Sequence, residues 1–480
     1  MKKLLCIILA LVLLTVPLTG CNKPSAGDNN STSTESTQEQ GYMLNGVSLS
    51  EYAIVYSATA PDYTERAANY LSNEIFERTG ILLTVLSDQQ QTVTLAHEIV
   101  VGETNRAISQ TLDAETNGLQ FAILADDAHI AMEGDFFVIA AAAYYFMETY
   151  FTADTRGITV AKETTVNEPI VKEAKNFIFL IGDGMGVNQT KLFELFSAEK
   201  LKAYSDGETA FYGYMFPYAG FARTNSLSGV TDSAAGGTAL ATGYKTENGY
   251  VGKDSKKNDV KSLTEYAIEL GKATAVMSTE VLTGATPAAF SAHTVSREYS
   301  DDITACQDAL KKNHGTLVLG DYGSDFTEGV IKDRMEKDIR DTLDTLSQNE
   351  NGFFMMYEEA YIDKHCHNNK SKDTFLTVLR FNQAIGCFME FAFYNPETFV
   401  IITADHETGG LERNKNGRLM FNSADHTGVD VPVFAYGQGA EVFHGVTVEN
   451  IQIPKTIAKM WGVELTGYQN DKYPALTPTA

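Results

Sequence analysis

Acids and histidines follow the apolar runs of this sequence at the points where the runs end. Asp183 lies between two glycines just after the run 177–181, and Glu358 directly follows the run 353–357. Carboxylates with imidazoles suit Zn²⁺, whereas carboxylate and hydroxyl oxygens suit Mg²⁺. One histidine after a strand is more often a hydrogen-bonded loop residue, but three of the nine histidines occupy such positions. The combination therefore predicts a metal site, with further candidate ligands at Asp363, His367, Asp405, His406 and His426.

A run of small residues around Ser233, in the segment 230–243, is a candidate for binding an anion. Its middle is predicted to be helical from near Ser233, and the first turn of a helix offers free backbone N–H groups to a phosphate. Taken alone, the segment is better explained by close helix packing with a serine N-cap. The interpretation of Ser233 as a nucleophile therefore depends on the groups around it.

Thr286 and Arg297 extend this set of polar groups. Thr286, in the run Ala-Thr-Pro-Ala-Ala, places a hydroxyl just after another predicted sheet segment. Arg297 carries a fixed-charge fork that fits two phosphate oxygens. The alternative for Arg297 is a surface ion pair with a neighbouring acid, at Glu298, Asp301 or Asp302.

The elements that must position these residues belong to an α/β architecture. Apolar runs alternate with helical segments from residue 176 onward, which predicts a mainly parallel sheet with helices on both faces. In such a sheet the ligand site lies beyond the carboxyl ends of the strands, so residues distant in sequence converge there. The main runs are 177–181, 274–277, 353–357, 399–403 and 431–436.

Residues 43–172 are predicted to form a smaller α/β accessory domain before the catalytic domain at 173–480. A helix is expected over 64–79 and ends at Gly80, and a second helix is expected over 136–149. This domain loosely resembles those that precede catalytic domains in some bacterial glycan-degrading enzymes, and a spacer role is at least as good an interpretation as glycan binding. The expected strands are 52–56, 81–86, 98–101, 121–125 and 129–132.

The first 42 residues are typical of an exported lipoprotein. Lys2 and Lys3 precede an apolar run too short to span a membrane, and Leu-Thr-Gly-Cys21 resembles the bacterial lipobox. We expect a signal peptide at 1–20, a lipid on Cys21 and a flexible tether over 21–42. The protein would then lie outside the cytoplasm, anchored to the membrane at the cell surface. The alternative is an ordinary signal peptide with a chance cysteine.

Composition limits the partners and the cross-links. The formal net charge of −25 leaves no basic footprint for nucleic acid. An acidic protein repels anionic substrates at long range, so a phosphate site would need local cations. Without Cys6 and Cys21, the chain keeps three cysteines that allow at most one disulfide, Cys306, Cys366 and Cys387.

Taken together and in order, the motifs over roughly 176–465 resemble those of the alkaline phosphatase family. The resemblance implies a first zinc ion on Asp363, His367 and His426, and a second on Asp183, Asp405 and His406. It also implies a magnesium ion on Asp183, Thr286 and Glu358, Ser233 as nucleophile, and Arg297 and Lys364 near the phosphate. The matching segments are 181–186, 231–235, 285–289, 296–297, 358–367, 403–407 and 425–428.

The sequence departs from this family at three places. Gly284 stands where relatives usually carry an aspartate or a histidine beside the magnesium, and the acidic neighbour usual for Lys364 is missing. We therefore expect magnesium to bind weakly or to be replaceable. Only 19 residues separate His406 from His426, which predicts an open crevice and leaves a homodimer as an open alternative.

The expected function is hydrolysis of small phosphate monoesters through a phosphoserine on Ser233. Arg297 favours monoesters because it neutralises the extra charge of a dianionic phosphate. A phosphodiesterase on the same metal scaffold is the main alternative, because fold does not fix function. A second alternative is a non-catalytic, glycan-binding surface lipoprotein, which the complete ligand set disfavours.

Overall fold

The computed structural model describes residues 41–112, 118–153, 156–196, 201, 208–324, 329–465 and 472–477. Residues 41–480 form one compact unit. The predicted signal peptide, Cys21 and all but the last two residues of the predicted tether lie outside the described residues. Among the described helices, none is both long and apolar enough to cross a membrane.

An eight-stranded sheet carries the second half of the chain, in the order β13-β12-β14-β10-β15-β20-β11-β21. Only β20 pairs antiparallel to its neighbours, so the sheet is mainly parallel, as predicted. Every residue of β10, β14 and β15 is buried, which explains their continuous apolar sequences. The strands are β10 (Asn176–Gly182), β11 (Tyr218–Arg223), β12 (Ala273–Ser278), β13 (Leu317–Leu319), β14 (Phe353–Glu359), β15 (Thr398–Thr403), β20 (Val431–Tyr436) and β21 (Thr447–Glu449).

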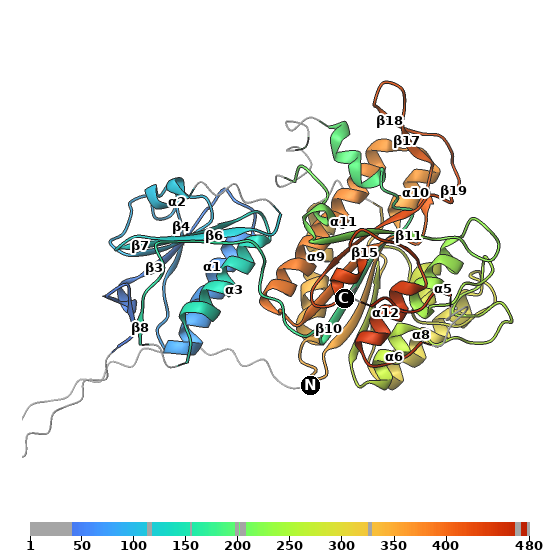
Figure 1. Ribbon diagram of the computed structural model, residues 1–480, viewed down its shortest axis with the longest axis horizontal. Helices are drawn as coiled ribbons and strands as arrows, with labels where there is room; N and C mark the ends of the chain where they lie inside the picture. Colours follow the sequence, from blue (N-terminus) through green and yellow to red (C-terminus); the bar gives the residue numbers. More distant parts are fainter. Residues whose placement is uncertain are drawn as a thin grey trace, which may run out of the picture. The chain divides into compact units, whose positions relative to one another are not determined.

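Helices cover both faces of this sheet. α9 and α11 pack on one face, whereas α6 and α7 pack on the other, where α5 and α12 join them (Figure 1). The layers therefore match the predicted α/β architecture. The helices are α5 (Ser233–Thr242), α6 (Leu263–Glu269), α7 (Ala285–Ala289), α8 (Ser300–His314), α9 (Gly329–Leu346), α10 (Tyr361–His367), α11 (Ser371–Tyr394) and α12 (Gln452–Met460).

A six-stranded sheet forms the first half, in the order β4-β3-β5-β7-β6-β9. Its strands are β3 (Ala53–Tyr56), β4 (Val85–Ser87), β5 (Glu98–Val101), β6 (Phe121–Ala125), β7 (His129–Gly134) and β9 (Glu163–Val166), with α1 (Tyr63–Thr79), α2 (Ala107–Thr111) and α3 (Val138–Tyr150). A three-stranded sheet joins β1 (Met43–Leu44), β2 (Val47–Ser48) and β8 (Gly157–Ile158).

The predicted strand at 81–86 is wrong over most of its length. Only β4 (Val85–Ser87) pairs with β3, while Leu82 is 69% exposed. The preceding Gly80 adopts a left-handed φ of 75° and ends α1, as predicted. Leu83 then packs under α1, where its carbonyl accepts a hydrogen bond from the Ser72 hydroxyl at 2.8 Å. The chain therefore needs four residues to leave the helix before it can join the sheet.

The helices of the first sheet pack against α11. The rings of Tyr70 and Tyr394 stack at 4.1 Å, and Arg66 Nε lies 2.8 Å from a carboxylate oxygen of Glu390. Both halves thus share one continuous apolar core. The division at residue 172 into accessory and catalytic domains stays a prediction. Cys306, Cys366 and Cys387 are all free thiols.

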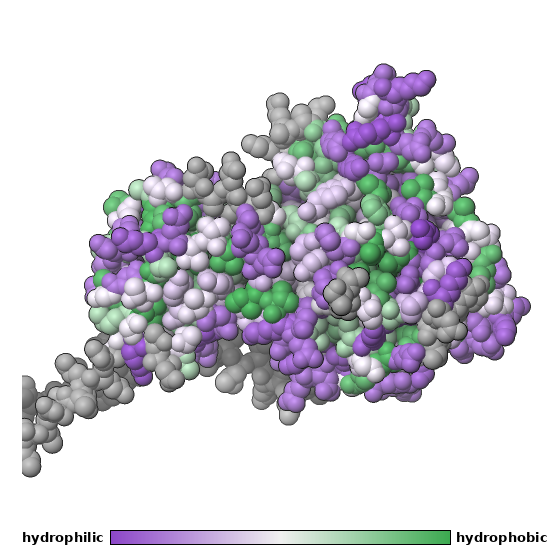
Figure 2. Space-filling model, viewed as in Figure 1, coloured by the Kyte–Doolittle hydropathy of each residue, from purple (hydrophilic) through white to green (hydrophobic). Residues whose placement is uncertain are grey.

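Two short antiparallel pairs lie beyond the main sheet. β16 (Glu407–Thr408) pairs with β19 (His426–Thr427), and β17 (Leu411–Arg413) pairs with β18 (Leu419–Phe421). The β17–β18 hairpin, at the top of the view, is mostly hydrophilic (Figure 2). The β16–β19 pair matters for the site because it brings the segments of His406 and His426 together. The 3₁₀ helices are η1 (Leu49–Glu51), η2 (Gln189–Leu195), η3 (Tyr212–Met215) and η4 (Ala440–Phe443).

Candidate active site

The carboxyl ends of three neighbouring strands bring the first candidate ligands together. β10 lies between β14 and β15, and Ile181 is opposite both Glu358 and Thr403. Asp183 follows β10 directly, and Asp405 follows β15 by two residues. These carboxylates therefore leave the sheet at the same edge, where the strand order predicts a ligand site.

Three of the predicted ligands form a buried group, defined here as Asp183, Asp405 and His406. Their ligand atoms all lie within 4.8 Å of one another. His406 Nε2 is 3.2 Å from Asp405 Oδ2 and 3.4 Å from Asp183 Oδ1. Asp405 and His406 have no exposed surface, and Asp183 has almost none. The sequence-based ligand set of the second zinc ion thus converges in the structure.

Three others form an outer group, defined here as Asp363, His367 and His426. Their ligand atoms also lie within 4.8 Å of one another. The Nε2 atoms of the two imidazoles are 3.1 Å apart, and both lie within 3.4 Å of Asp363 Oδ1. α10 supplies Asp363 and His367, and β19 supplies His426. The ring centroids of His426 and His406 are 3.6 Å apart, so the two groups adjoin.

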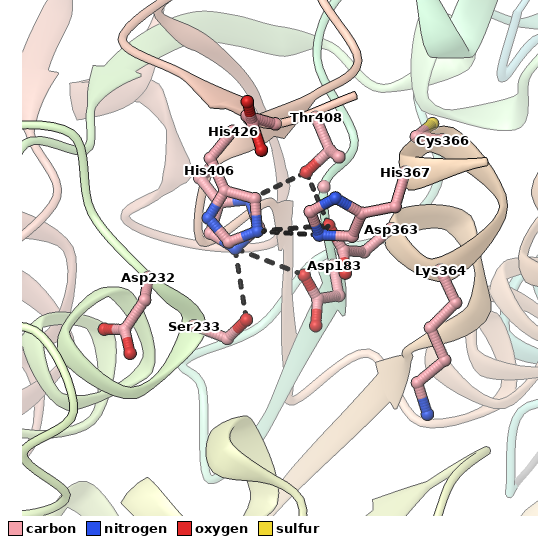
Figure 3. A network of polar contacts seen from close by, with 12 residues as sticks. Asp183, Asp232, Ser233, Asp363, Lys364, Cys366, His367, His406, Thr408 and His426 are labelled. Atoms are coloured by element: carbon pink, nitrogen blue, oxygen red, sulfur yellow. Dashed lines mark hydrogen bonds and ion pairs between the residues drawn. The ribbon is translucent and has the colours of Figure 1, made fainter. Parts of the chain in front are cut away.

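Each of the three histidines is held by its other ring nitrogen. Nδ1 of His367 lies 2.5 Å from the carbonyl oxygen of Ala424, and Nδ1 of His426 lies 2.9 Å from that of Thr231. A carbonyl can only accept, so both Nδ1 atoms carry the proton. The Nε2 atoms are therefore the nitrogens that face the outer group, and each offers a lone pair to a metal ion once it carries no proton. Figure 3 shows these rings facing one another across the carboxylates.

Thr408 links the two groups and was missed in the sequence. Its hydroxyl donates to Asp363 Oδ1 at 2.5 Å and lies 3.2 Å from Nδ1 of His406. Because its single proton goes to the carboxylate, the hydroxyl accepts from the imidazole. His406 therefore presents a bare Nε2 to the buried group. The only signal in the sequence was its position two residues after His406.

Ser233 opens α5 beside the buried group. Its Oγ lies 3.1 Å from Nε2 of His406, and the serine is 4% exposed (Figure 3). The alternative interpretation of Ser233 as the N-cap is wrong. Asp232 is the N-cap, and its carboxylate accepts from the N–H of Ala235 at 3.0 Å. The serine hydroxyl is therefore free of the capping role and points at the ligands.

Small residues let α5 approach the ligands closely. A Cβ at Gly236 would lie 2.9 Å from the carbonyl oxygen of Asp405, and one at Gly237 would lie 3.2 Å from the Cα of Thr286. The packing interpretation of this segment is thus also correct. Close packing is what holds Ser233 against the buried group.

Arg297 pairs with the residue next to the serine. Its Nη1 lies 3.4 Å from Asp232 Oδ2, and its backbone N–H donates to the carbonyl of Gly249 at 2.9 Å. The expected alternative of an ion pair with an acid near it in sequence is therefore wrong. Since Asp232 precedes Ser233, the pair holds the guanidinium near Ser233.

The donor atoms fit divalent cations. Several buried side-chain oxygens in the described part of the chain have no hydrogen-bond partner, and four of them belong to predicted metal ligands: Asp183 Oδ1, Asp405 Oδ2, Thr286 Oγ1 and Glu358 Oε1. Buried polar atoms are rarely left unpaired, so each needs another partner. All four belong to residues that the sequence assigned to the second zinc ion or to magnesium.

The charges of the site also indicate that it binds cations. Burial, reinforced by Asp405 and Asp363, raises the pKa of Asp183 well above its ordinary value. Burial and the charge of Glu280 likewise raise the pKa of Glu358. Burial would also raise the pKa of Asp363, but His367 and His426 outweigh it and lower that pKa. Acids this crowded repel one another unless cations lie between them.

Comparisons with known proteins agree with this geometry. The alkaline phosphatase family model matches residues 174–322 and 327–422, more than half of the chain. The chain belongs to this family.

Two relatives from Bacillus subtilis illustrate the match. Alkaline phosphatase 4 is 31% identical over 307 residues, which cover 52% of this chain and 65% of that protein, slightly less than two thirds of it. Alkaline phosphatase 3 is 26% identical over 416 residues, which cover 60% of this chain and 89% of that one.

The fold also matches solved alkaline phosphatases. The enzyme of the Antarctic bacterium TAB5 is 28% identical, with a TM-score of 0.53 over 60% of this chain and 98% of its own. A histidine-to-aspartate variant of that enzyme is described with Mg bound in its M3 site, and it is 27% identical with a TM-score of 0.51 over 61% and 99% of the two chains.

Lys364 departs from the expectation drawn from the alkaline phosphatase family. The acidic neighbour usual in the family is missing, and its ammonium instead forms an ion pair with Glu280. The Lys364 side chain extends from α10 away from the imidazoles (Figure 3). The sequence could not show this pair, because its members are 84 residues apart, with Glu280 just after β12 and Lys364 on α10.

Proposed function

We propose that this protein hydrolyses phosphate monoesters and that Ser233 is the nucleophile. The observation that carries the proposal is the position of Ser233 Oγ, 3.1 Å from His406 Nε2 at the start of α5. A serine hydroxyl is a weak nucleophile unless a neighbour activates it, and this one adjoins two groups of metal-type ligands. Membership of the alkaline phosphatase family supports the same reaction class.

Two zinc ions and one magnesium ion are the proposed cofactors. The outer group would hold one zinc and the buried group the other. Magnesium would take Thr286 and Glu358 together with Asp183. Bound there, such ions supply positive charge that favours the serine alkoxide and the departing ester oxygen.

The chain's own residues would bind and orient the substrate. Arg297 would contact two non-bridging phosphate oxygens, and Asp232 keeps the guanidinium beside the nucleophile. The free N–H groups of the first turn of α5 add a positive field for an incoming anion. These local charges oppose the repulsion expected from a chain of net charge −25.

The proposed reaction has two displacements. Ser233 Oγ forms a bond to phosphorus while the bond to the ester oxygen breaks and the alcohol leaves with a proton. Water then attacks the phosphoserine, the serine oxygen regains a proton, and phosphate departs. The sum is one ester and one water converted to one alcohol and one phosphate.

The test compares p-nitrophenyl phosphate with bis-p-nitrophenyl phosphate as substrates of the full chain. Each is measured with zinc and magnesium, after chelation, and in Ser233→Ala. Ser228→Ala is the matched control, because Ser228 lies in the preceding loop with its hydroxyl turned to Glu247. We expect monoester hydrolysis that chelation and Ser233→Ala both abolish and Ser228→Ala leaves intact.

Other outcomes would change the assignment. A strong preference for the diester would move the function to a phosphodiesterase on the same ligands. Full activity in Ser233→Ala would exclude the serine nucleophile. No turnover of either substrate by a zinc-loaded chain would contradict the phosphatase proposal.

The proposed location is the outer face of the membrane, through a lipid on Cys21. It is supported by the lipobox-like Leu-Thr-Gly-Cys and the short apolar run before it. Cys21→Ala should release the chain from the membrane fraction of producing cells. Unchanged membrane association would contradict the anchor.

A further inference from the structure

The space beside Gly284 is filled by another residue. A Cβ at position 284 would lie 2.0 Å from Oε1 of Glu280 and 2.5 Å from its Cδ. Gly284 itself has φ −55° and ψ 155°, a conformation open to any residue. The backbone therefore does not require a glycine there. The carboxylate of Glu280 occupies the space that a side chain at position 284 would fill.

Hydrogen bonds hold Glu280 next to a proposed magnesium ligand. Its N–H donates to the Ser278 hydroxyl at 3.1 Å, and that hydroxyl donates to Oε2 of Glu358. Its carbonyl accepts from the N–H of Asp321 at 2.8 Å. The main-chain N–H of Glu280 is thus joined to the carboxylate of Glu358 through one bridging hydroxyl. Hydrogen bonds fix both the N–H and the carbonyl of Glu280.

The carboxylate itself reaches between two parts of the site. One oxygen lies against Gly284, two residues before Thr286, and the other pairs with the ammonium of Lys364, the neighbour of Asp363. The Glu280 side chain is only 12% exposed. Glu358 is fully buried and lies opposite Ser278, two residues before Glu280. Two carboxylates so placed require a cation near them.

We propose that Glu280 is the additional acid of the magnesium centre and replaces, from a different position in the chain, the side chain that residue 284 lacks. The proposal rests on the proposed function, because it presumes magnesium at Thr286 and Glu358. The carboxylates of Asp183, Glu358 and Glu280 then carry three negative charges. One divalent cation and the ammonium of Lys364 together balance these charges. The expectation of weak magnesium binding rested on Gly284 and on the missing acidic neighbour of Lys364, and Glu280 would supply a carboxylate for both.

An ordinary surface ion pair is the competing explanation for Glu280 and Lys364. Lys175 and Glu397 form such a pair, with side chains 54% and 40% exposed and an N–O distance of 3.2 Å. Glu397 immediately precedes β15 and so lies at the opposite edge of the sheet from the ligands. It offers a matched control in which a paired glutamate is neutralised away from the site.

The experiment measures magnesium affinity rather than turnover. Magnesium is titrated calorimetrically into the zinc-loaded full chain, for the unaltered protein, Glu280→Gln and Glu397→Gln. Loss of a group that supports a metal site costs about 10- to 100-fold in affinity, which is the weakening expected for Glu280→Gln. Glu397→Gln should bind magnesium as the unaltered chain does. Unchanged zinc content in each variant shows that the folded site persists.

A second variant pair tests the replacement itself. Glu280→Ala empties the space beside position 284, and adding Gly284→Asp returns a carboxylate there. The double variant should bind magnesium more tightly than Glu280→Ala alone. Equal affinities of these two variants would overturn the spatial replacement.

The outcomes separate this proposal from the one on which it rests. A Glu280→Gln variant that binds magnesium as tightly as Glu397→Gln would overturn the role of Glu280, while zinc binding and monoester hydrolysis would still support the phosphatase. An unaltered chain that binds neither zinc nor magnesium would overturn the proposed function, and the role of Glu280 with it.

Discussion

The two ligand groups differ in how the fold builds them. The buried group comes from the ends of β10 and β15, which pair directly, and its His406 has no exposed surface. The outer group comes from α10 and the short strand β19, and the His367 side chain is 38% exposed. One group is therefore part of the sheet, whereas the other depends on a helix and a hairpin that lie beyond it.

Burial and contact with a carboxylate shift the pKa values of two histidines in opposite directions. Burial lowers the pKa of His406. Contact with Asp363 raises the pKa of His367 to about 9, against a smaller opposing effect of burial. The buried group is thus ready to receive a cation at neutral pH through its imidazole, while the outer group must first lose a proton.

Asp405→Asn should give the largest effect, because it removes a charge from the buried group without changing its shape. We expect this variant to lose the zinc beside Ser233 while the outer group still binds its ion. Turnover should fall about 1,000-fold, the upper range for losing one group that stabilises a reacting anion. Metal content and kcat for a monoester measure both effects.

Asp373→Asn is the control for this variant, since Asp373 opens α11 in an exposed pair with Lys370. It should keep full metal content and activity. Loss of both metal ions in Asp405→Asn would contradict the separation of the two groups. Retention of both ions with normal turnover would remove the buried group from the chemistry.

The buried group was also the part of the site that the sequence predicted best. Buried parallel strands are continuous apolar runs, so 98–101 matches β5 in full, and 177–181 and 399–403 lie within β10 and β15. Residues that follow such strands converge at one edge of a sheet, which is why Asp183 and Asp405 were found. Helix periodicity and a glycine C-cap placed α1 within one residue.

The residues that the sequence missed are those whose partners tertiary packing selects. Thr408 touches Asp363 only because β16 lies against α10. Glu280 meets Lys364 across 84 residues, and neither the spacing nor the pattern of charges indicates this pair. Asp232 takes the cap of α5 from Ser233, although both residue types cap helices well. Local helix propensity cannot decide between such neighbours, because the choice depends on the residues that tertiary packing places beside them.

The second largest effect should come from lowering the pH, which should weaken zinc binding by the outer group. A raised pKa means that His367 holds its proton up to about pH 9 in the metal-free protein, and zinc must displace that proton. Apparent zinc affinity should therefore fall about tenfold per pH unit, or about 100-fold from pH 9 to pH 7. Titration of Asp405→Asn with zinc and a competing chelator isolates the outer group. A flat profile over this range would contradict the protonated His367.

Thr408→Val should affect both groups at once, by about 10- to 100-fold in zinc affinity, because it removes the hydroxyl that orients a ligand of each. Thr408→Ser is the matched control, since it keeps the hydroxyl and loses only a methyl group. Zinc affinity at each group, measured by stepwise titration, gives the result. A change confined to one group would show that the hydroxyl does not couple them.

Arg297→Ala should give the smallest effect, because in the proposed function Arg297 would contact the substrate, whereas its ion pair is with Asp232 and with neither ligand group. Its side chain is 36% exposed, so solvent screens its charge, and we expect about a tenfold loss in kcat/KM for the monoester, the lower range for a hydrogen bond to a charged group. The loss should be larger for p-nitrophenyl phosphate than for bis-p-nitrophenyl phosphate, because only the monoester carries the second negative charge. Zinc content should stay unchanged at both groups, and Arg297→Lys should recover part of the activity by keeping the charge without the fork. Equal losses on the two substrates would mean that Arg297 does not distinguish a dianionic phosphate, and the preference for monoesters would then have to come from the ligand groups themselves.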